Sequence, residues 1–299
     1  MMGIVFAELD LYEGRYDAAI AGFAKALEPD DLPSFFAANM SLAAMILAGK
    51  SWDAVVYGKS LIAAARARDD TLGIDWTYFM WVNALIAADK LDEAREAVAR
   101  WSENTGTQGA ATVYAYLRWD IDLLQGRKPK SLEAELTKRV ESTPKGASGD
   151  VYRLLARVGS DPKKLRAWAE TLASGIIGAT EARSVRFQID ERLRQSLAAR
   201  ADLLSGQVER GLATFEALAR PGAFEITNEG DVFDVTRFER QYAEALDALG
   251  RRDEAEVVWR RILSHGYPRL LCMDITVQAQ RRLGLPVGVP PQDGGGGPR

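Results

Sequence analysis

The sequence predicts an all-α protein, organised as a solenoid of antiparallel helix pairs. A unit made of a turn and a helix rich in small residues recurs along the chain. The stretches between these units also carry apolar residues at i, i+3, i+4 and i+7, which is the spacing of one helix face. No stretch combines strict apolar–polar alternation with β-branched enrichment, so we predict no sheet.

The recurring unit begins with a turn residue at positions 14, 49, 89, 126, 159, 206 and 250. Clear copies, in chain order, are GRYDAAIAGFAKAL from Gly14, DKLDEAREAVARW from Asp89 and GRRDEAEVVWRRIL from Gly250. Further copies start at positions 49 and 206, and weaker ones at 126 and 159. Their spacing is irregular, which implies longer helices or loops around 174–182 and 221–235.

The helix that precedes a turn is predicted from FFAANMSLAAMILA (35–48), YFMWVNALIAA (78–88), TVYAYLRWDIDLL (112–124) and RFERQYAEALDAL (237–249). The prolines outside the C-terminal tail fall at predicted helix starts or in loops, as expected for residues that cannot continue a helix.

The composition is that of an ordinary globular protein. The chain has 299 residues, of which 47% are hydrophobic and 27% charged, and a formal net charge of −4. Slight acidity provides no basic surface for nucleic acid or an anionic membrane. No apolar run reaches the ~20 residues of a membrane-spanning helix, and the N-terminus lacks the basic start of a secretory signal. Cys272 is the single cysteine, which fits a reducing compartment. We therefore expect a cytoplasmic protein without membrane insertion or direct nucleic-acid binding.

These units resemble tetratricopeptide repeats, which are helix pairs with a period of about 34 residues. The resemblance implies a right-handed α-solenoid of six to seven pairs, in which small residues let two helices approach and large ones fill the gap to the next pair. The residues that carry the resemblance are Gly14, Tyr16, Ala19, Phe23 and Ala26 in the first unit, Leu91, Ala94 and Val98 in the third, and Ala243, Leu246, Gly250, Ala255, Trp259 and Ile262 in the last.

We expect this solenoid to cover residues 1–285. The repeats are predicted to be regular over about 1–105 and 183–264 and degenerate over 106–182, with a C-terminal capping helix over about 270–283. The Pro/Gly-rich residues 286–299 predict a disordered tail. The long connection 221–235 is interpreted either as a lid or contact surface, or as an insertion without a role.

The resemblance also implies a concave groove, lined by the first helix of each pair, that binds a peptide. Asn83 is similar to the asparagine with which the family holds a peptide backbone or terminal carboxylate, although the basic partners of such a clamp are not evident nearby. For the aromatic candidates the alternative is packing between units, and Arg240 is expected to be exposed, with a solvated helix face as its alternative. Counted back from the turns, the groove candidates are Asn39, Trp76, Phe79, Asn83, Arg237, Arg240 and Glu244.

The sequence shows no motif that predicts catalysis, a metal site or a cofactor. AMILAGKS (44–51) approximates a phosphate-binding loop, but Ala44 replaces its first glycine and the segment follows a predicted helix rather than a strand. His265, the single histidine, is predicted at a helix C-terminus, where it can interact with the negative end of the helix. One cysteine and one histidine cannot supply the four ligands of a structural zinc.

We therefore predict a non-catalytic scaffold or adaptor that binds proteins or peptides in the groove of the array. The sequence leaves homo-oligomerisation open. A first alternative is a sensor or regulatory module of a signalling or transcription system, as a fragment of a longer chain, because the first helix is short. A second alternative is an α-helical enzyme, because a carboxylate site leaves no local sequence signature.

Overall fold

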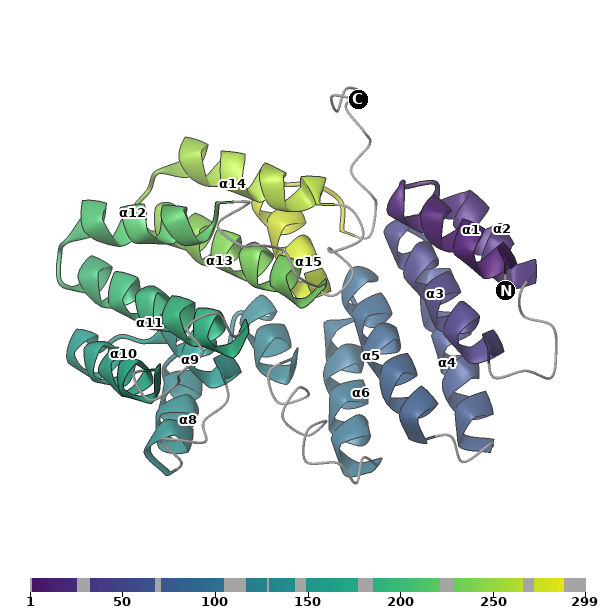
Figure 1. Cartoon of the computed structure of the whole chain (residues 1–299), viewed down its shortest axis with the longest axis horizontal. Coiled ribbons are helices and arrows are strands. Elements are labelled where there is room, and N and C mark those ends of the chain that lie inside the picture. Colours follow the sequence, from purple (N-terminus) through teal and green to yellow (C-terminus); the bar gives the residue numbers. More distant parts are fainter. Residues whose placement is uncertain are drawn as a thin grey trace. The chain divides into compact units, whose positions relative to one another are not determined.

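The fold was analysed in a computed structural model, which describes residues 2–25, 33–67, 71–104, 117–127, 129–142, 149–176, 185–220, 229–265 and 272–287. Within these ranges the chain is helical and contains no strand, which confirms the all-α fold class. Residues 117–124 are helical. The other helices (Figure 1) are α1 (Met2–Tyr12), α2 (Tyr16–Lys25), α3 (Pro33–Leu47), α4 (Ser51–Ala67), α5 (Thr71–Ala87), α6 (Leu91–Asn104), α8 (Pro129–Ser142), α9 (Gly149–Val158), α10 (Pro162–Ile176), α11 (Val185–Leu204), α12 (Val208–Leu218), α13 (Glu229–Ala248), α14 (Arg252–Ser264) and α15 (Met273–Arg282).

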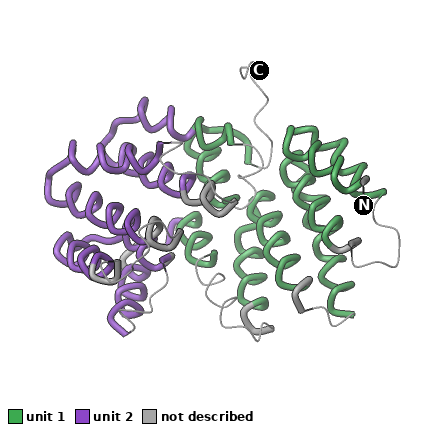
Figure 2. Tube along the Cα trace, in the orientation of Figure 1, with its two compact units in different colours: residues 1–125, 260–299 green, residues 126–259 purple. Residues whose placement is uncertain are grey.

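The chain forms two compact units (Figure 2). Unit 1 comprises residues 1–125 and 260–299, and unit 2 comprises residues 126–259. Unit 1 contains α1 to α6 and α15, and unit 2 contains α8 to α13. The division of residues 1–285 into regular and degenerate repeats stays a prediction.

One turn geometry joins the two helices of most pairs. Six of the seven predicted turn positions have a left-handed backbone, with φ from 58° at Asp89 to 78° at Gly14 and Gly206. The following residue donates its backbone N–H to the carbonyl five positions earlier, as from Lys50 to Met45 (2.9 Å). Such a turn satisfies the last carbonyls of one helix and reverses the chain, and it favours glycine because that residue lacks a Cβ.

The turn at Gly159 is built differently. Asp161 caps the start of α10 instead, since its Oδ1 accepts a hydrogen bond from the backbone N–H of Lys163 at 2.9 Å.

Small residues lie where the paired helices come closest. The position five residues after the turn is buried in five of the units, as Ala19, Ala54, Ala94, Gly211 and Ala255. At Gly211 a Cβ atom would lie 2.8 Å from the carbonyl oxygen of Ala199, so only glycine fits. These positions let α1 pack on α2, α3 on α4, α5 on α6 and α11 on α12.

The last described helix, α15, belongs to the core of unit 1. It packs against α5, and its Met273 and Val277 join the buried cluster formed by α1 to α6. Its Arg281 forms an ion pair with Asp89, 192 positions earlier, and donates to the carbonyl of Leu124 at 2.9 Å. Seven of its ten residues are buried, and its role as a C-terminal cap stays a prediction.

Candidate functional site

Of the groove candidates in unit 1, the two aromatic residues lie near the surface and the two asparagines do not. Trp76 and Phe79 contact each other on α5, with ring centroids 5.8 Å apart and planes inclined by 32°. The side chain of Trp76 is 42% exposed, whereas Phe79 packs partly against the core. Asn39 on α3 and Asn83 on α5 are buried.

The amide of Asn83 is used within its own helix. Its Nδ2 donates a hydrogen bond to the carbonyl of Phe79, one turn earlier, at 3.0 Å. In this arrangement Asn83 presents no amide to a ligand in solvent, because its side chain is enclosed by unit 1. Peptide binding by Asn83 stays a prediction that needs a rearranged side chain.

The groove candidates in unit 2 belong to a polar network on α13. The expectation that Arg240 is exposed is wrong, because its side chain is 2% accessible on a segment of α13 that is buried from Phe238 to Gln241. Glu244 forms a two-point ion pair with Arg157 of α9, with Nη2–Oε1 and Nε–Oε2 distances of 2.6 and 2.9 Å. Arg237 is half-buried.

Neighbouring residues extend this network inside unit 2. Gln241 accepts a hydrogen bond from the hydroxyl of Ser196 on α11 and donates to the carbonyl of Arg153 on α9 at 3.2 Å. The contacts of Glu244 and Gln241 thus tie α13 to α9 and α11. Paired and buried groups of this kind specify packing, and they offer little to a ligand in solvent.

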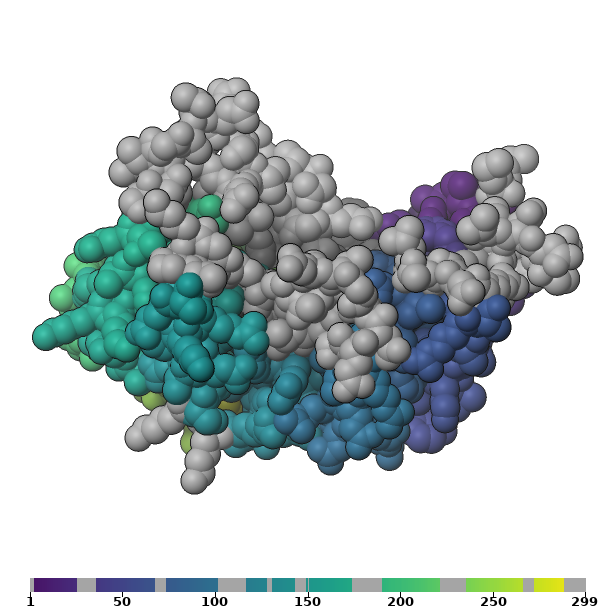
Figure 3. Space-filling view, turned by 90° about the horizontal axis from the view of Figure 1, so that it is seen from below, coloured from purple at the N-terminus to yellow at the C-terminus, as the bar shows by residue number. Residues whose placement is uncertain are grey.

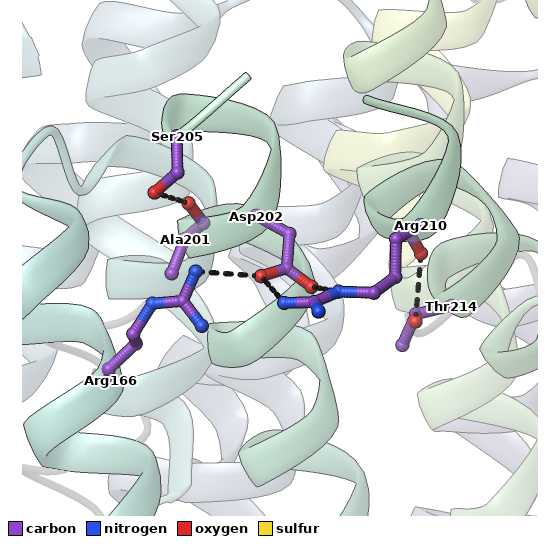
Figure 4. Close-up of polar contacts among 6 residues, drawn as sticks. All are labelled: Arg166, Ala201, Asp202, Ser205, Arg210 and Thr214. Carbon is purple, nitrogen blue, oxygen red and sulfur yellow. Dashed lines mark hydrogen bonds and ion pairs between the residues drawn. The ribbon is translucent and has the colours of Figure 1, made fainter. Parts of the chain in front are cut away.

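A second charged cluster in unit 2 joins three helices (Figure 4). Asp202 of α11 is buried and accepts hydrogen bonds from Arg166 Nη2 of α10 at 2.8 Å and from Arg210 Nε of α12 at 2.6 Å. The hydrogen bonds from Arg210 hold the pKa of Asp202 below its ordinary value against the opposing effect of burial, and Arg166 adds to the lowering. A carboxylate that stays ionised and doubly paired is poorly suited to general acid–base work, so we assign this cluster a structural role.

An open hollow lined by apolar and charged side chains lies in unit 1, between α4 and α6. These helices flank α5 (Figure 1), and the space between them has a volume of about 620 Å³. In the space-filling view from below, the residues coloured indigo to blue, which include α4 and α6, lie on the surface (Figure 3). We call this hollow the α4/α6 cleft. Its lining residues are Trp52, Val55, Val56, Lys59, Ser60 and Ala63 of α4, Trp81 of α5, and Glu93, Glu96, Ala97 and Arg100 of α6.

The floor of the α4/α6 cleft is fixed by the contact between α4 and α5. The indole Nε1 of Trp81 donates to the carbonyl of Val55 at 3.1 Å, which uses the one polar atom of the ring. A Cβ atom at Gly58 would lie 2.9 Å from Cδ1 of Trp81, so glycine is what lets α4 sit on the indole. Small side chains at Ala63 and Ala97 leave the space above this floor unfilled.

Large apolar side chains at the cleft remain in contact with water. Trp52 is 55% exposed and Val56 is 60% exposed, one helical turn apart on α4. The ammonium group of Lys90 lies 5.4 Å from the centroid of the Trp52 ring, within the range of a cation–π contact. Exposed apolar residues that line a hollow, with charged residues at its rim, are typical of interaction sites.

Sequence reasoning missed the α4/α6 cleft because it searched the first helix of each pair, whereas α4 and α6 are second helices. The residues Ala54, Val55, Gly58 and Ile62 form the buried face of α4, and Trp52 and Val56 lie away from it. A tryptophan and a valine one turn apart on the outer face of an amphipathic helix were the available signal.

The remaining candidates for chemistry have ordinary structural positions. In AMILAGKS, residues 44–47 end α3, Gly49 forms the left-handed turn and Ser51 starts α4, so the strand that a phosphate-binding loop needs is absent from this segment. His265 directly follows the end of α14, as predicted, and Cys272 is a buried cysteine directly before α15. Within the described ranges, no group of three or more histidine, cysteine, aspartate or glutamate residues is arranged to hold a metal ion.

Comparison with family models and with curated proteins identifies no relative. No protein-family model matches the sequence, and no curated protein matches it. None of the helices in the described part of the chain has the length and hydropathy needed to span a bilayer.

Proposed function

We propose that this protein is a non-catalytic scaffold or adaptor that binds segments of other proteins. The observation that carries the proposal is the α4/α6 cleft, where Trp52 and Val56 are more than half exposed beside an apolar floor. Exposing such side chains costs free energy in the unbound protein, and a partner that covers them recovers roughly 1.5–3 kcal/mol per large apolar side chain.

The repeated helix pair supports the same proposal. Helix pairs joined by one recurrent turn form rigid surfaces without loops that need to be ordered, and pre-organised surfaces bind with a smaller entropic cost. The turn geometry and the buried small residues favour assigning these pairs to the tetratricopeptide class. We infer a cytoplasmic protein from the composition and from the presence of a single cysteine in the sequence. Of the predicted groove residues, Trp76 and Phe79 are the ones we retain as a second contact surface, because Trp76 is partly exposed.

The proposal is tested by selecting binders from a displayed library of random peptides on the immobilised full-length chain. We expect enriched peptides to bind in solution, and to lose affinity by tenfold or more when Trp52 is replaced by alanine, since a central aromatic contact carries a binding energy of about 2 kcal/mol or more. Phe6→Ala is the matched control, because Phe6 is 65% exposed on α1, outside the cleft. Peptides that bind the Trp52→Ala chain as tightly as the wild type would overturn the assignment of the cleft.

A further inference from the structure

We infer that the partner segment in the α4/α6 cleft is an amphipathic α-helix that lies antiparallel to α4 and α6, with acidic residues near its N-terminus and basic residues near its C-terminus. This inference rests on the proposed function and names the kind of partner. It follows from the length of the cleft, the hydrogen-bonding capacity of its walls and the order of its charges.

The walls of the cleft have the length of a short helix. The lining residues of α4 run from Trp52 to Ala63 and recur every three or four positions, which makes one stripe of about 16 Å at 1.5 Å per residue. The lining residues of α6 run from Glu93 to Arg100, a further two turns. A straight, mainly apolar stripe of this length fits the i, i+4 and i+7 side chains of a docked helix.

The walls offer no strand edge to the backbone of an extended peptide, and their polar groups other than Ser60 are charged. Both walls are helices, whose backbone groups are satisfied internally, so no sheet edge is available for strand addition. Ser60 is the one uncharged polar residue of the lining, and its hydroxyl already donates to the carbonyl of Tyr57 at 2.7 Å. An extended segment would therefore bury unpaired amides, whereas a helix brings its own hydrogen bonds.

The two walls differ in polarity, which requires an amphipathic ligand. The α4 wall is mainly apolar through Trp52, Val55, Val56 and Ala63, and the floor is Trp81. The α6 wall carries most of the charged groups. A helix with a single apolar face would place that face on α4 and the floor, and its flank would reach the charges of α6.

The order of charges along the cleft determines the direction of the helix. Lys90 lies over Trp52, so α4 and α6 begin at the same end of the cleft. Glu93 and Glu96 lie toward that end and Arg100 toward the other, with exposed ion pairs Lys90–Glu93 (4.0 Å) and Arg100–Glu96 (3.1 Å). On the α4 wall, Lys59 adds a positive charge in the half of the lining that ends at Ala63.

In an antiparallel helix, the same terminal residues interact favourably with the charges of the cleft and with the dipole of their own helix. Its N-terminal turn lies toward Arg100 and Lys59, so acidic residues there face cations and also favour the positive end of their own helix. Its C-terminal turn lies toward Glu93 and Glu96, where basic residues are favoured for the same two reasons. A parallel helix would need the reversed charge order, which its own dipole opposes.

The inference is tested with three synthetic amidated peptides of about 14 residues, a length of roughly 20 Å when helical. The first has leucines on one face, glutamates in its first turn and lysines in its last turn. The second exchanges the glutamates and lysines, and the third carries a central proline that breaks the helix. Affinities are measured by fluorescence anisotropy at low salt on the full chain, because exposed charges are screened at higher ionic strength.

We expect the first peptide to bind at least threefold more tightly than the second and at least tenfold more tightly than the third. Trp52→Ala and Val56→Ser should weaken the first peptide, Phe6→Ala should not, and Glu93→Lys with Glu96→Lys should reduce the preference for the first peptide over the second. Circular dichroism of each variant checks that it is folded.

Two results would overturn the inference. If the proline peptide binds as well as the first peptide, the partner is not a helix; if the two charge orders bind equally at low salt, the direction is wrong. Both results leave the proposed function intact when peptides selected from the random library still depend on Trp52. Loss of that dependence would instead contradict the proposed function itself.

Discussion

At the scale of single residues, ion pairs between different helices of unit 2 hold those helices together. Asp202 accepts hydrogen bonds from arginines of α10 and α12, and Glu244 on α13 is held by Arg157 of α9. Asp202 is buried, whereas Glu244 is half-buried and its partner Arg157 is buried, so removing Glu244 leaves a buried donor without this acceptor. The same residue types that suggest binding in a sequence therefore serve packing here.

We expect Asp202→Asn to lower the free energy of unfolding by about 1–3 kcal/mol at neutral pH, because hydrogen bonds to a charged acceptor are lost. The pKa of Asp202 is lowered by Arg210 and Arg166 in the folded state. Its stabilising contribution is therefore complete above the unfolded pKa of about 3.9 and is lost as the pH falls through the lower folded value. Urea unfolding at several pH values should show the difference between variant and wild type shrinking below about pH 4.

The control for Asp202 is Glu216→Gln, which breaks the exposed pair Arg220–Glu216 (3.0 Å) in the same unit. This change should cost no more than about 0.5 kcal/mol, because exposed ion pairs contribute little. If Asp202→Asn lowers the free energy of unfolding by the same amount in acid as at neutral pH, the role assigned to the charge of Asp202 is wrong.

At the scale of elements, the left-handed turn is the feature that makes a helix pair. It needs φ near +75°, as at Gly14 and Gly49, and glycine adopts this conformation without strain. The next helix starts directly after it, and in five of the seven units the residue five positions after the turn is small and buried. The turn reverses the chain, and the small residue at this fixed distance from it lets the two helices pack closely.

We expect Gly14→Ala to destabilise the α1–α2 pair by about 1–2 kcal/mol, because alanine pays a steric cost in the left-handed region. Space is not the cause, since the nearest atom to a new Cβ is the Tyr16 hydroxyl at an ordinary 3.9 Å. Gly3→Ala is the matched control: it lies within α1 with open space around it, and it should stabilise by up to about 1 kcal/mol. Thermal melting followed by circular dichroism should show shifts of opposite sign; shifts of the same sign would contradict the backbone explanation.

At the scale of the whole molecule, the chain forms two compact units, and one of them is built from both ends of the sequence. Unit 1 contains α1 to α6 and also α15, whose Val277 is fully buried in the same cluster as Leu85 and Ile86. Unit 2 has its own buried core, including Leu155, Leu165, Leu197 and Phe215. Separate cores are expected to lose their structure in separate steps.

We therefore expect differential scanning calorimetry to resolve two transitions. Val277→Asp should lower the unit 1 transition strongly, because it buries an unpaired carboxylate, while Gln278→Asp, at a less buried position of the same helix, should lower it less. Asp202→Asn should lower the unit 2 transition and leave the unit 1 transition unchanged. A single transition that both variants shift would show that the two units unfold together.

The sequence by itself determined the helices and the turns between them. Apolar spacing and the glycines at positions 14, 49, 206 and 250 are local signals, and the structure confirms that the chain turns at those positions. The burial of Ala19, Ala94 and Ala255 also follows from the sequence, because small residues recur at a constant distance from the turn.

Only the tertiary structure decided which faces are buried and which remain open. Asn39, Asn83 and Arg240 were placed by counting along a helix, but their exposure depends on side chains that pack against them from other helices. Trp52 and Val56 stay exposed because Ala63, two turns after Val56 on α4, and Ala97, on α6, are too small to fill the cleft. The binding site proposed here is a gap between helices, and a gap is a property of packing rather than of any local pattern.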